Sequence, residues 1–281
     1  MEGSVREAAR RVLRRVVPRL PRAERMVSLL DPLVGPPSVP TDVRTGDVTL
    51  ALDLRDQAHR RMWWGVYERD EASAARRLLR PGDVAVDVGA NSGWFTALAA
   101  RAVGPTGAVH AFEPMPRTLA LLRRTVELSA LANVIVHPVA AYDRDATLEI
   151  ADAGDETGWA SLVYRSPERS ITTVRAVALG PYLDRVVEGP VRLVKIDVEG
   201  AEPMVLASLR ERLARRETAV LCELDPVLLG VTGTTPEAVV DSLLELGLAP
   251  FEVGRSLVPL PAGARPRTAN TLFTPPGWSV R

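Results

Sequence analysis

The chain has 281 residues with 35 basic and 35 acidic side chains, so no overall charge favours nucleic acid as a partner. A chain of this length can bury a substantial core and fits one large domain with an appended segment. The single cysteine, Cys222, excludes an internal disulfide framework and a multi-cysteine metal site, and it indicates a reducing, cytoplasmic location.

We expect residues 1–80 to form a helical and extended segment. Its beginning is rich in arginine and repeats apolar residues at helical spacing, namely Val5, Ala9, Val12 and Val16. It lacks the hydrophobic segment of a secretory signal, and no apolar run in the chain has the roughly 18 residues of a membrane span. A surface or partner-docking helix is therefore favoured over membrane-surface attachment or a transit peptide. Abundant Ala, Arg, Pro and Val are typical of a GC-rich bacterial genome, which further disfavours the transit peptide.

A Pro/Gly-rich stretch, residues 31–47, is interpreted as a connector after this helix. VTLALDL (Val48–Leu54) alternates well enough for a short strand, and the sequence from His59 to Leu79 is mainly helical in pattern. The PGD turn at Pro81–Asp83 then begins the main domain, residues 81–281.

The main domain repeats apolar runs separated by helical patterns. Five runs follow one another: VAVDVG, AVHAFEP, NVIVHPVAA, VRLVKIDVE and TAVLCELDP. Near-continuous apolar strands that alternate with helices predict a parallel sheet covered on both faces. A helical stretch, TPEAVVDSLLELG, and two closing strands, APFEVG and TANTLFTP, complete the pattern.

Residues 146–184 interrupt this rhythm with ATLEIADAG, GWASLVYRS and SITTVRAVAL, which resemble strands or extended loops. An insertion before the fourth run would lie near the carboxyl ends of the strands, where open α/β sheets bind ligands. We therefore expect a substrate-facing insertion. The alternative is a β-hairpin that only extends the sheet.

The turn after the first run predicts a nucleotide site. Asp87 is followed by Gly89, Asn91 and Gly93 at alternate positions before a helix begins. Small residues permit a tight turn and close approach of a ligand, and the helix N-terminus offers free N–H groups. A dinucleotide site needs G-x-G-x-x-G, but position 94 is Trp. The pattern instead fits the S-adenosylmethionine loop of Rossmann-like methyltransferases.

The ends of the second and third runs are compatible with this site. Glu113 lies 20 residues beyond Gly93, where a carboxylate can accept both ribose hydroxyls. The third run ends with Ala140, Ala141 and Tyr142, where adenine commonly lies in such sites; Tyr142 would either stack on it or pack.

With DVGANSGWFT, FEP, VKIDVEGAE and LCE in this order, the chain resembles the FkbM-type methyltransferase family over roughly Trp64 to Glu223. The resemblance implies a class I (Rossmann-like) methyltransferase fold with a seven-stranded, mostly parallel sheet and helices on both faces. It also implies S-adenosylmethionine as methyl donor, S-adenosylhomocysteine as product, and a hydroxyl acceptor on a sugar or polyketide natural product. VALGPYLD departs from the usual family wording, so the acceptor region transfers least.

Motif by motif, the resemblance implies a set of site residues. Asp197 and Glu199 would lie beside the reacting centre, and Tyr67 and Glu68 would close over the donor. Donor binding is implied at Asp87, Gly89, Asn91, Gly93 and Glu113, and we add Trp94, Ala141, Tyr142 and Asp197 as expected donor contacts.

The fourth run carries three alternating charges. Lys195, Asp197 and Glu199 would share one face of a strand, and such charges belong at an exposed mouth or in pairs. The alternative for this set is a structural ion pair. Lys195 is the only lysine of the chain, and we suppose that the space behind Asp197 admits an ammonium but not the broad guanidinium of arginine.

Methyl transfer to an alcohol benefits from a general base. Asp197 is the first choice, and Glu199 and Glu223 are second choices. His137 has the best-suited unperturbed pKa, but its position in the third run favours a core or adenine-side role, and His110 is expected to be structural.

Two further features of the site are left open. Asp197, Glu199 and Glu223 could form an oxygen-rich Mg²⁺ site, although Lys195 competes for them, so no metal is expected. Three tryptophans could form an apolar wall for a sugar or polyketide ring, although packing is the more common role: Trp64, Trp94 and Trp159.

The sequence thus favours an O-methyltransferase acting on a small hydroxylated molecule. We expect no nucleic acid partner and allow for a homo-oligomer. The alternatives are a non-catalytic donor-binding or interaction protein and, opposed by the missing glycine, an NAD(P)-dependent dehydrogenase.

Overall fold

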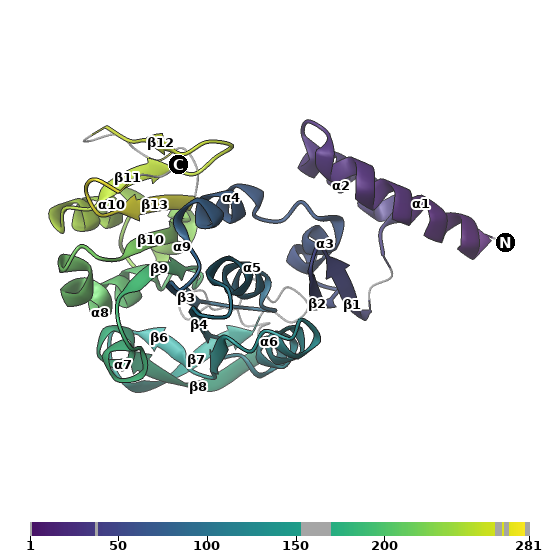
Figure 1. Ribbon diagram of the computed structural model, residues 1–281. Helices are drawn as coiled ribbons and strands as arrows, with labels where there is room; N and C mark the ends of the chain where they lie inside the picture. Colours follow the sequence, from purple (N-terminus) through teal and green to yellow (C-terminus); the bar gives the residue numbers. More distant parts are fainter. Residues whose placement is uncertain (1, 37–38, 153–169, 262–265, 267–269, 279–281) are drawn as a thin grey trace.

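The computed structural model describes residues 2–36, 39–152, 170–261, 266 and 270–278 (Figure 1). Five parallel strands form one side of its largest sheet, as their apolar sequences predict. They are β3 (Val84–Val88), β4 (Ala108–Phe112), β5 (Val134–His137), β9 (Val191–Ile196) and β10 (Ala219–Glu223).

Three further strands extend this sheet beyond β10. They are β13 (Asn270–Thr274), which is antiparallel to β10, then β11 (Ala249–Glu252) and β12 (Val258–Pro259). The full order is β12-β11-β13-β10-β9-β3-β4-β5. The predicted class I, Rossmann-like α/β fold is confirmed. The described part of the sheet has eight strands instead of seven because the two-residue β12 adds to its edge.

Helices cover both faces of the sheet, since alternate strand residues face opposite layers. The helices of this region are α4 (Arg69–Leu78), α5 (Trp94–Val103), α6 (Pro116–Leu128), α7 (Leu179–Val186), α8 (Glu202–Ala214), α9 (Pro226–Val231) and α10 (Pro236–Glu245). In β3, Ala85 packs into a core with α4 and α5, whereas Val86 packs into a second core with α7, α8 and α10.

The direction in which the chain adds strands reverses at β3. From β3 the chain adds β4 and then β5 on one side, and later returns to place β9 and β10 on the other side. Connections leave β3 and β9 in opposite directions, so a crevice forms at the carboxyl ends of these two neighbouring strands. This is where the architecture places a ligand site.

The sequence predicted that the third apolar run is one strand, and this prediction was wrong. It is divided at Pro138 into β5, which pairs with β4, and β6 (Ala140–Tyr142), which pairs with β8 (Ser170–Ala178) in a separate three-stranded sheet. Proline cannot donate to a ladder, which explains the break. The third strand of that sheet is β7 (Ala146–Asp152), antiparallel to β8.

Two of the extended segments predicted within residues 146–184 are therefore confirmed as β7 and β8, and they form their own sheet instead of extending the large one. The middle segment, GWASLVYRS, lies outside the described residues, as does Trp159. The end of the same stretch is α7.

The N-terminal segment contains more structure than predicted. Helix α1 (Glu2–Val16) and the short η1 (Val17–Arg19) lead to α2 (Ala23–Val34), and α3 (Gln57–Trp64) follows a β-hairpin. Interpreting residues 31–47 as a connector was wrong. Helix α2 continues to Val34, and β1 (Pro40–Thr45) pairs antiparallel with β2 (Val48–Asp53). Proline at the first position of an edge strand does not prevent this pairing.

The N-terminal segment shares its hydrophobic core with the main sheet. Val27 of α2, Leu50 of β2 and Trp64 of α3 belong to the same buried cluster as Ala85 of β3. The predicted division of the chain near residue 80 stays a prediction. In the described chain, every helix is too short or too polar to cross a bilayer.

The contact between α7 and α8 gives a test of the packing. At Gly180 of α7 a Cβ atom would overlap the carbonyl oxygen of Ser208 on α8, so Gly180→Ala must push the helices apart. We expect it to lower the free energy of unfolding by about 2–3 kcal/mol in urea denaturation. Gly230→Ala on α9, where the space beside the glycine is open, is the matched control and should be neutral or slightly stabilising. Equal effects of the two changes would contradict the packing.

Candidate functional site

A cavity of about 1860 Å³ opens at the carboxyl ends of β3, β4, β9 and β10. Gly89, Glu113, Asp197 and Glu223, which follow or end these four strands, all line it. The volume exceeds the roughly 300–1000 Å³ of a common small-molecule site, because the lining continues from the strand ends onto the upstream segment.

The turn after β3 has three left-handed residues, Gly89 (φ 82°), Asn91 (φ 49°) and Gly93 (φ 88°), and α5 begins at the next position. Both glycines of this turn have a structural role other than admitting a ligand. A Cβ on Gly89 would overlap the carbonyl oxygen of Asp197, and one on Gly93 would lie 2.7 Å from Leu122 Cδ1 on α6. The glycines therefore allow the turn to pack against the end of β9 and against α6.

Glu113 ends the second run and is held by three protein donors. Its Oε2 accepts from the Asn91 backbone N–H (2.8 Å), and its Oε1 accepts from the Met115 N–H (2.9 Å) and the Thr118 hydroxyl (2.7 Å). Burial raises the pKa of this carboxyl. A carboxylate offers about four lone-pair sites, so the arrangement leaves room for one further hydrogen bond. Accepting both ribose hydroxyls would require Glu113 to release a protein donor.

Three of the expected donor contacts do not line the cavity. Asp87 is fully buried behind the turn, where its Oδ2 accepts from the Thr96 hydroxyl (2.5 Å) and burial raises its pKa. Gly93 faces α6. Tyr142 packs with the three-stranded sheet, and the Arg144 guanidinium lies over its ring. The other expected donor contacts line it: Tyr67, Glu68, Gly89, Asn91, Trp94, Glu113, Ala141 and Asp197. The residues predicted to be catalytic also line it: Lys195, Asp197 and Glu199.

The three charged side chains of the fourth run, Lys195, Asp197 and Glu199, lie close together. The two-residue period of a strand explains the positions of Lys195 and Asp197 but not that of Glu199. The Lys195 side chain is buried, and its Nζ donates to Asp197 Oδ2 at 2.9 Å. Strand β9 ends at Ile196, and the Asp197 N–H donates to the Val88 carbonyl. Glu199 lies in the following loop with a left-handed φ of 54°.

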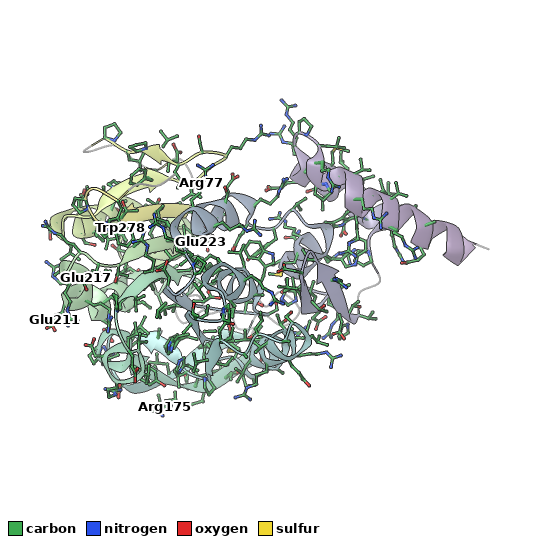
Figure 2. The ribbon with its side chains drawn as sticks, in the orientation of Figure 1. Arg77, Arg175, Glu211, Glu217, Glu223 and Trp278 are labelled. Atoms are coloured by element: carbon green, nitrogen blue, oxygen red, sulfur yellow. The ribbon has the colours of Figure 1, made fainter. Side chains whose placement is uncertain are left out.

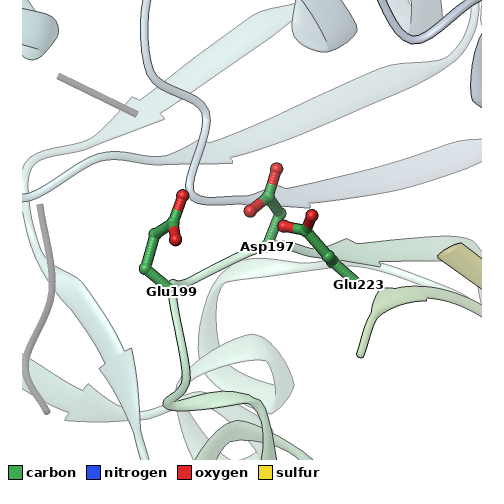
Figure 3. Close-up of side chains that lie close together, drawn as sticks. All are labelled: Asp197, Glu199 and Glu223. Carbon is green, nitrogen blue, oxygen red and sulfur yellow. The ribbon is translucent and has the colours of Figure 1, made fainter. Parts of the chain in front are cut away.

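Glu199 and Glu223 nevertheless lie close to Asp197. One carboxylate oxygen from each of the three residues lies within 4.8 Å of the others, and Figure 3 shows them facing one another. Figure 2 places Glu223 toward the middle of the molecule, whereas Glu211 and Glu217 lie at its outer edge.

Burial and mutual repulsion shift the pKa values of these three carboxyls apart. Burial opposes ionisation of Asp197, but the Lys195 charge and a hydrogen bond from Glu223 outweigh it and hold the pKa of Asp197 below its usual value. The Asp197 charge and burial raise the pKa of Glu223 well above its usual value. Burial and then Asp197 raise the pKa of Glu199 to about 9. At neutral pH the cluster therefore contains an ionised Asp197 and a protonated Glu199, and the pKa of Glu223 is raised well above its usual value.

Lys195 stays charged despite its burial. Burial alone would lower its pKa, but the charges of Asp197, Glu68 and Asp87 outweigh that effect and raise the pKa well above its usual value. Asp197, Glu199 and Glu223 are carboxylate ligands of a kind that could hold a hard divalent cation. The Lys195 ammonium already neutralises the charge at their centre.

The upstream segment contributes one wall of the cavity. Tyr67 meets Trp94 edge to face, with ring centroids 5.4 Å apart, and Glu68 follows at the entrance to α4. Burial raises the pKa of Glu68 to about 7, with Lys195 opposing the shift. Trp64 is fully buried and donates its indole N–H to Asp31 (2.6 Å), so it belongs to the core.

The histidines of β4 and β5 do not line the cavity themselves. His110 Nδ1 lies 3.0 Å from His137 Nε2, and His137 Nδ1 lies 3.1 Å from the Tyr182 hydroxyl. The His137 ring also stacks on Phe112. Burial lowers the pKa of His137 to about 4, so it is neutral at physiological pH.

Two residues near the site were missed from the sequence. Glu202, the first residue of α8, accepts from the Val198 and Gly200 N–H groups and so shapes the loop of Glu199. An acidic residue at a helix start after Gly200 could have signalled this. His59 contacts Asn91 across 32 positions of sequence, and no local pattern indicates that contact.

The model of a protein family described as "Methyltransferase FkbM domain" matches residues 87–247, more than half of the chain. The fold is also similar to solved structures at low identity. One is a methyltransferase FkbM from Methylobacillus flagellatus, at 12% identity and a TM-score of 0.44. That match covers 82% of this chain and 55% of the other, so this chain spans about half of that protein.

Two more solved structures show comparable similarity. A SAM-dependent O-methyltransferase from Thermotoga maritima has 18% identity and a TM-score of 0.40, with 74% of this chain and 64% of that chain covered. Fibrillarin from Aeropyrum pernix, in complex with natively bound S-adenosyl-L-methionine, has 16% identity and a TM-score of 0.39, with 72% of each chain covered. No curated protein matches the chain.

The raised pKa of Glu199 predicts a pH-dependent stability effect. Because the folded state holds this proton up to about pH 9 and an unfolded glutamate releases it near pH 4.3, stability falls as pH rises through that window. Glu199→Gln cannot ionise, so we expect its advantage over the wild type to grow by at least about 1 kcal/mol between pH 5 and pH 9 in urea unfolding.

Glu211→Gln, on the exposed surface of α8, controls for loss of a glutamate from the molecule. A Glu199→Gln effect that is the same at both pH values would contradict the protonation states derived above.

Proposed function

The chain belongs to the FkbM methyltransferase family, and on that premise we propose that it transfers a methyl group from S-adenosylmethionine to a hydroxyl of a small molecule. The observation that carries the proposal is the ionised Asp197, held by Lys195 in a cavity at the switch point of the sheet. We propose a sugar or a polyketide-derived compound as acceptor, in bacterial natural-product biosynthesis.

S-adenosylmethionine supplies a methyl group activated by a positively charged sulfur. The cavity residues fit this donor, because Glu113 retains room for one hydrogen bond from a ribose hydroxyl and the Tyr67–Trp94 pair gives an apolar wall. The proposed donor-binding residues at the cavity are Tyr67, Glu68, Gly89, Asn91, Trp94, Glu113, Ala141 and Asp197, with Asp87, Gly93 and Tyr142 acting from behind it.

Methyl transfer from a sulfonium to an alcohol removes a charge instead of creating one. The residues must therefore align the reacting atoms and exclude water, and they must also accept the hydroxyl proton. The attacking oxygen becomes strongly acidic as its new bond forms, so a carboxylate of low pKa suffices. Asp197 is ionised and can accept this proton, whereas Glu199 is already protonated at neutral pH and the pKa of Glu223 is raised well above its usual value.

Lys195 has the role of keeping that base available. Its ammonium lies 2.9 Å from Asp197 Oδ2 and 5.6 Å from the centre of the Phe95 ring, in a buried position. We propose that this space takes an ammonium and not the wider guanidinium, which would explain the only lysine in a chain whose other basic residues are arginines.

We further propose a free small molecule as acceptor, since the balanced charge of the chain gives no attraction to nucleic acid. A cytoplasmic location is proposed from the single, buried Cys222. Association into a homo-oligomer is compatible with the proposal and is measurable by analytical ultracentrifugation.

The proposed reaction predicts O-methylated products. Purified protein, S-adenosylmethionine with a labelled methyl group and a panel of hydroxylated sugars and polyketides should give a product detected by mass spectrometry. Asp197→Asn removes the base but preserves the side-chain shape, so turnover should fall by about 100-fold or more. The dissociation constant for S-adenosylhomocysteine, measured by calorimetry, should change by less than about threefold.

Equal loss of binding and turnover would limit Asp197 to donor binding and remove its role as the base. Tight binding by the wild type with no transfer to any acceptor would support a non-catalytic donor-binding protein. Lys195→Arg tests the companion hypothesis, because unchanged turnover would reduce Lys195 to an ordinary ion-pair partner.

The carboxylate cluster also predicts how activity responds to metal removal. We expect EDTA to leave turnover unchanged and added Mg²⁺ not to raise it, because Lys195 neutralises Asp197 and Glu199 holds a proton that a metal would have to displace. The raised pKa of Glu223 likewise opposes the ionised form that a metal needs. Activity lost in EDTA and restored by Mg²⁺, but not by Zn²⁺ or Ca²⁺, would overturn this expectation.

A further inference from the structure

His59 connects the upstream segment to the turn after β3. It lies on α3, its side chain is fully buried, and its Nε2 is 2.9 Å from Asn91 Oδ1. We propose that His59 is a positioning residue that orients the Asn91 side-chain amide, so that its NH₂ group is presented to the methyl donor. This inference rests on the function proposed above.

A backbone group fixes the tautomer of the His59 ring. The Asp53 N–H donates to Nδ1 at 3.0 Å, and a backbone N–H can only donate. Although the Asp53 carbonyl oxygen also lies 3.2 Å from Nδ1, the N–H occupies the lone pair of that nitrogen. A neutral imidazole that accepts at Nδ1 has its proton on Nε2.

The tautomer in turn fixes the orientation of Asn91. Because Nε2 carries a proton, the Asn91 atom that faces it is the acceptor Oδ1. The Nδ2 group then points elsewhere, and it has no protein acceptor among the residues that the structure describes. Asn91 lines the cavity, so this NH₂ group can donate to a hydroxyl or carboxylate oxygen of the donor.

The remaining contacts of the turn show that the upstream segment holds it as a unit. The Ser92 hydroxyl contacts Met62 Sδ of α3 at 3.6 Å, and the Ser92 carbonyl accepts from the Thr125 hydroxyl at 2.7 Å. Thr125 Oγ1 also accepts from the Ala51 N–H of β2 at 2.9 Å. His59 is the member of this network that contacts the side chain of Asn91, which lines the cavity.

The chain offers a matched pair of substitutions that separates positioning from packing. The amide of Gln reaches the place of Nε2, so His59→Gln can still donate to Asn91. The shorter Asn reaches only the place of Nδ1, so His59→Asn can still accept from Asp53 but loses Asn91. We expect His59→Asn to weaken S-adenosylhomocysteine binding by about tenfold, and His59→Gln by no more than about threefold, in calorimetry.

Asn91→Asp gives a second, independent test. It preserves an oxygen for His59 but replaces the NH₂ group with an acceptor, so donor binding should weaken by tenfold or more. In steady-state assays both weakened variants should raise KM for S-adenosylmethionine and leave KM for the acceptor unchanged. His110→Asn, which removes a buried imidazole outside the cavity lining, is the control and should leave the affinity for S-adenosylhomocysteine unchanged.

The outcomes distinguish this inference from the proposed function. A wild-type protein that binds no S-adenosylhomocysteine overturns the proposed function, and the role of His59 with it. If the wild type binds but His59→Asn and His59→Gln weaken binding equally, or neither does, the positioning role alone is overturned. If His59→Asn does not fold, Asn91→Asp decides, and unchanged affinity in that variant overturns the inference.

Discussion

The ion pair between Lys195 and Asp197 is the interaction on which the rest of the site depends. Removing an ammonium and a carboxylate from water costs several kcal/mol per ion, so the pair persists only because its geometry is fixed. The β9 ladder holds Lys195, and the bond from the Asp197 N–H to Val88 holds the partner. Burial and the Asp197 charge together then make ionisation of Glu199 unfavourable, and the Asp197 charge is the largest cause of the raised pKa of Glu223. The ion pair thereby influences the protonation of the whole cluster.

The upstream segment completes the site. Its hairpin and α3 share a hydrophobic core with α4, α5 and the large sheet, and its polar groups reach the turn after β3. Tyr67 and Glu68 then form a wall of the same cavity. The α/β part contributes the crevice at its switch point, whereas the upstream part contributes side chains that no strand end supplies. The two regions follow one another along the chain, but their side chains line one shared cavity.

The sequence predicted the features that repeat and missed those that depend on single backbone positions. Alternating strands and helices predicted the sheet, its two helical layers and the edge at which Glu113, Asp197 and Glu223 meet. The sequence did not show that Pro138 divides one apolar run between two sheets, because the residues on both sides of the proline are apolar and fit a strand in either sheet. Nor could periodicity place Glu199, which reaches the cluster through a left-handed turn after the strand has ended. The contact of His59 depends on tertiary packing and has no local signal.

The contact between Gly89 and the Asp197 carbonyl leaves no space for even a methyl group. The glycine turn and the strand end that carries Asp197 are therefore in close backbone contact, and a side chain at position 89 would have to displace one of them. Adaptation of the cavity to a new acceptor is consequently restricted to its other walls, such as Ile150 of the second sheet and Leu228 of α9, where side chains can change size independently. We therefore expect changes of acceptor specificity to come from these walls and not from the glycine turn.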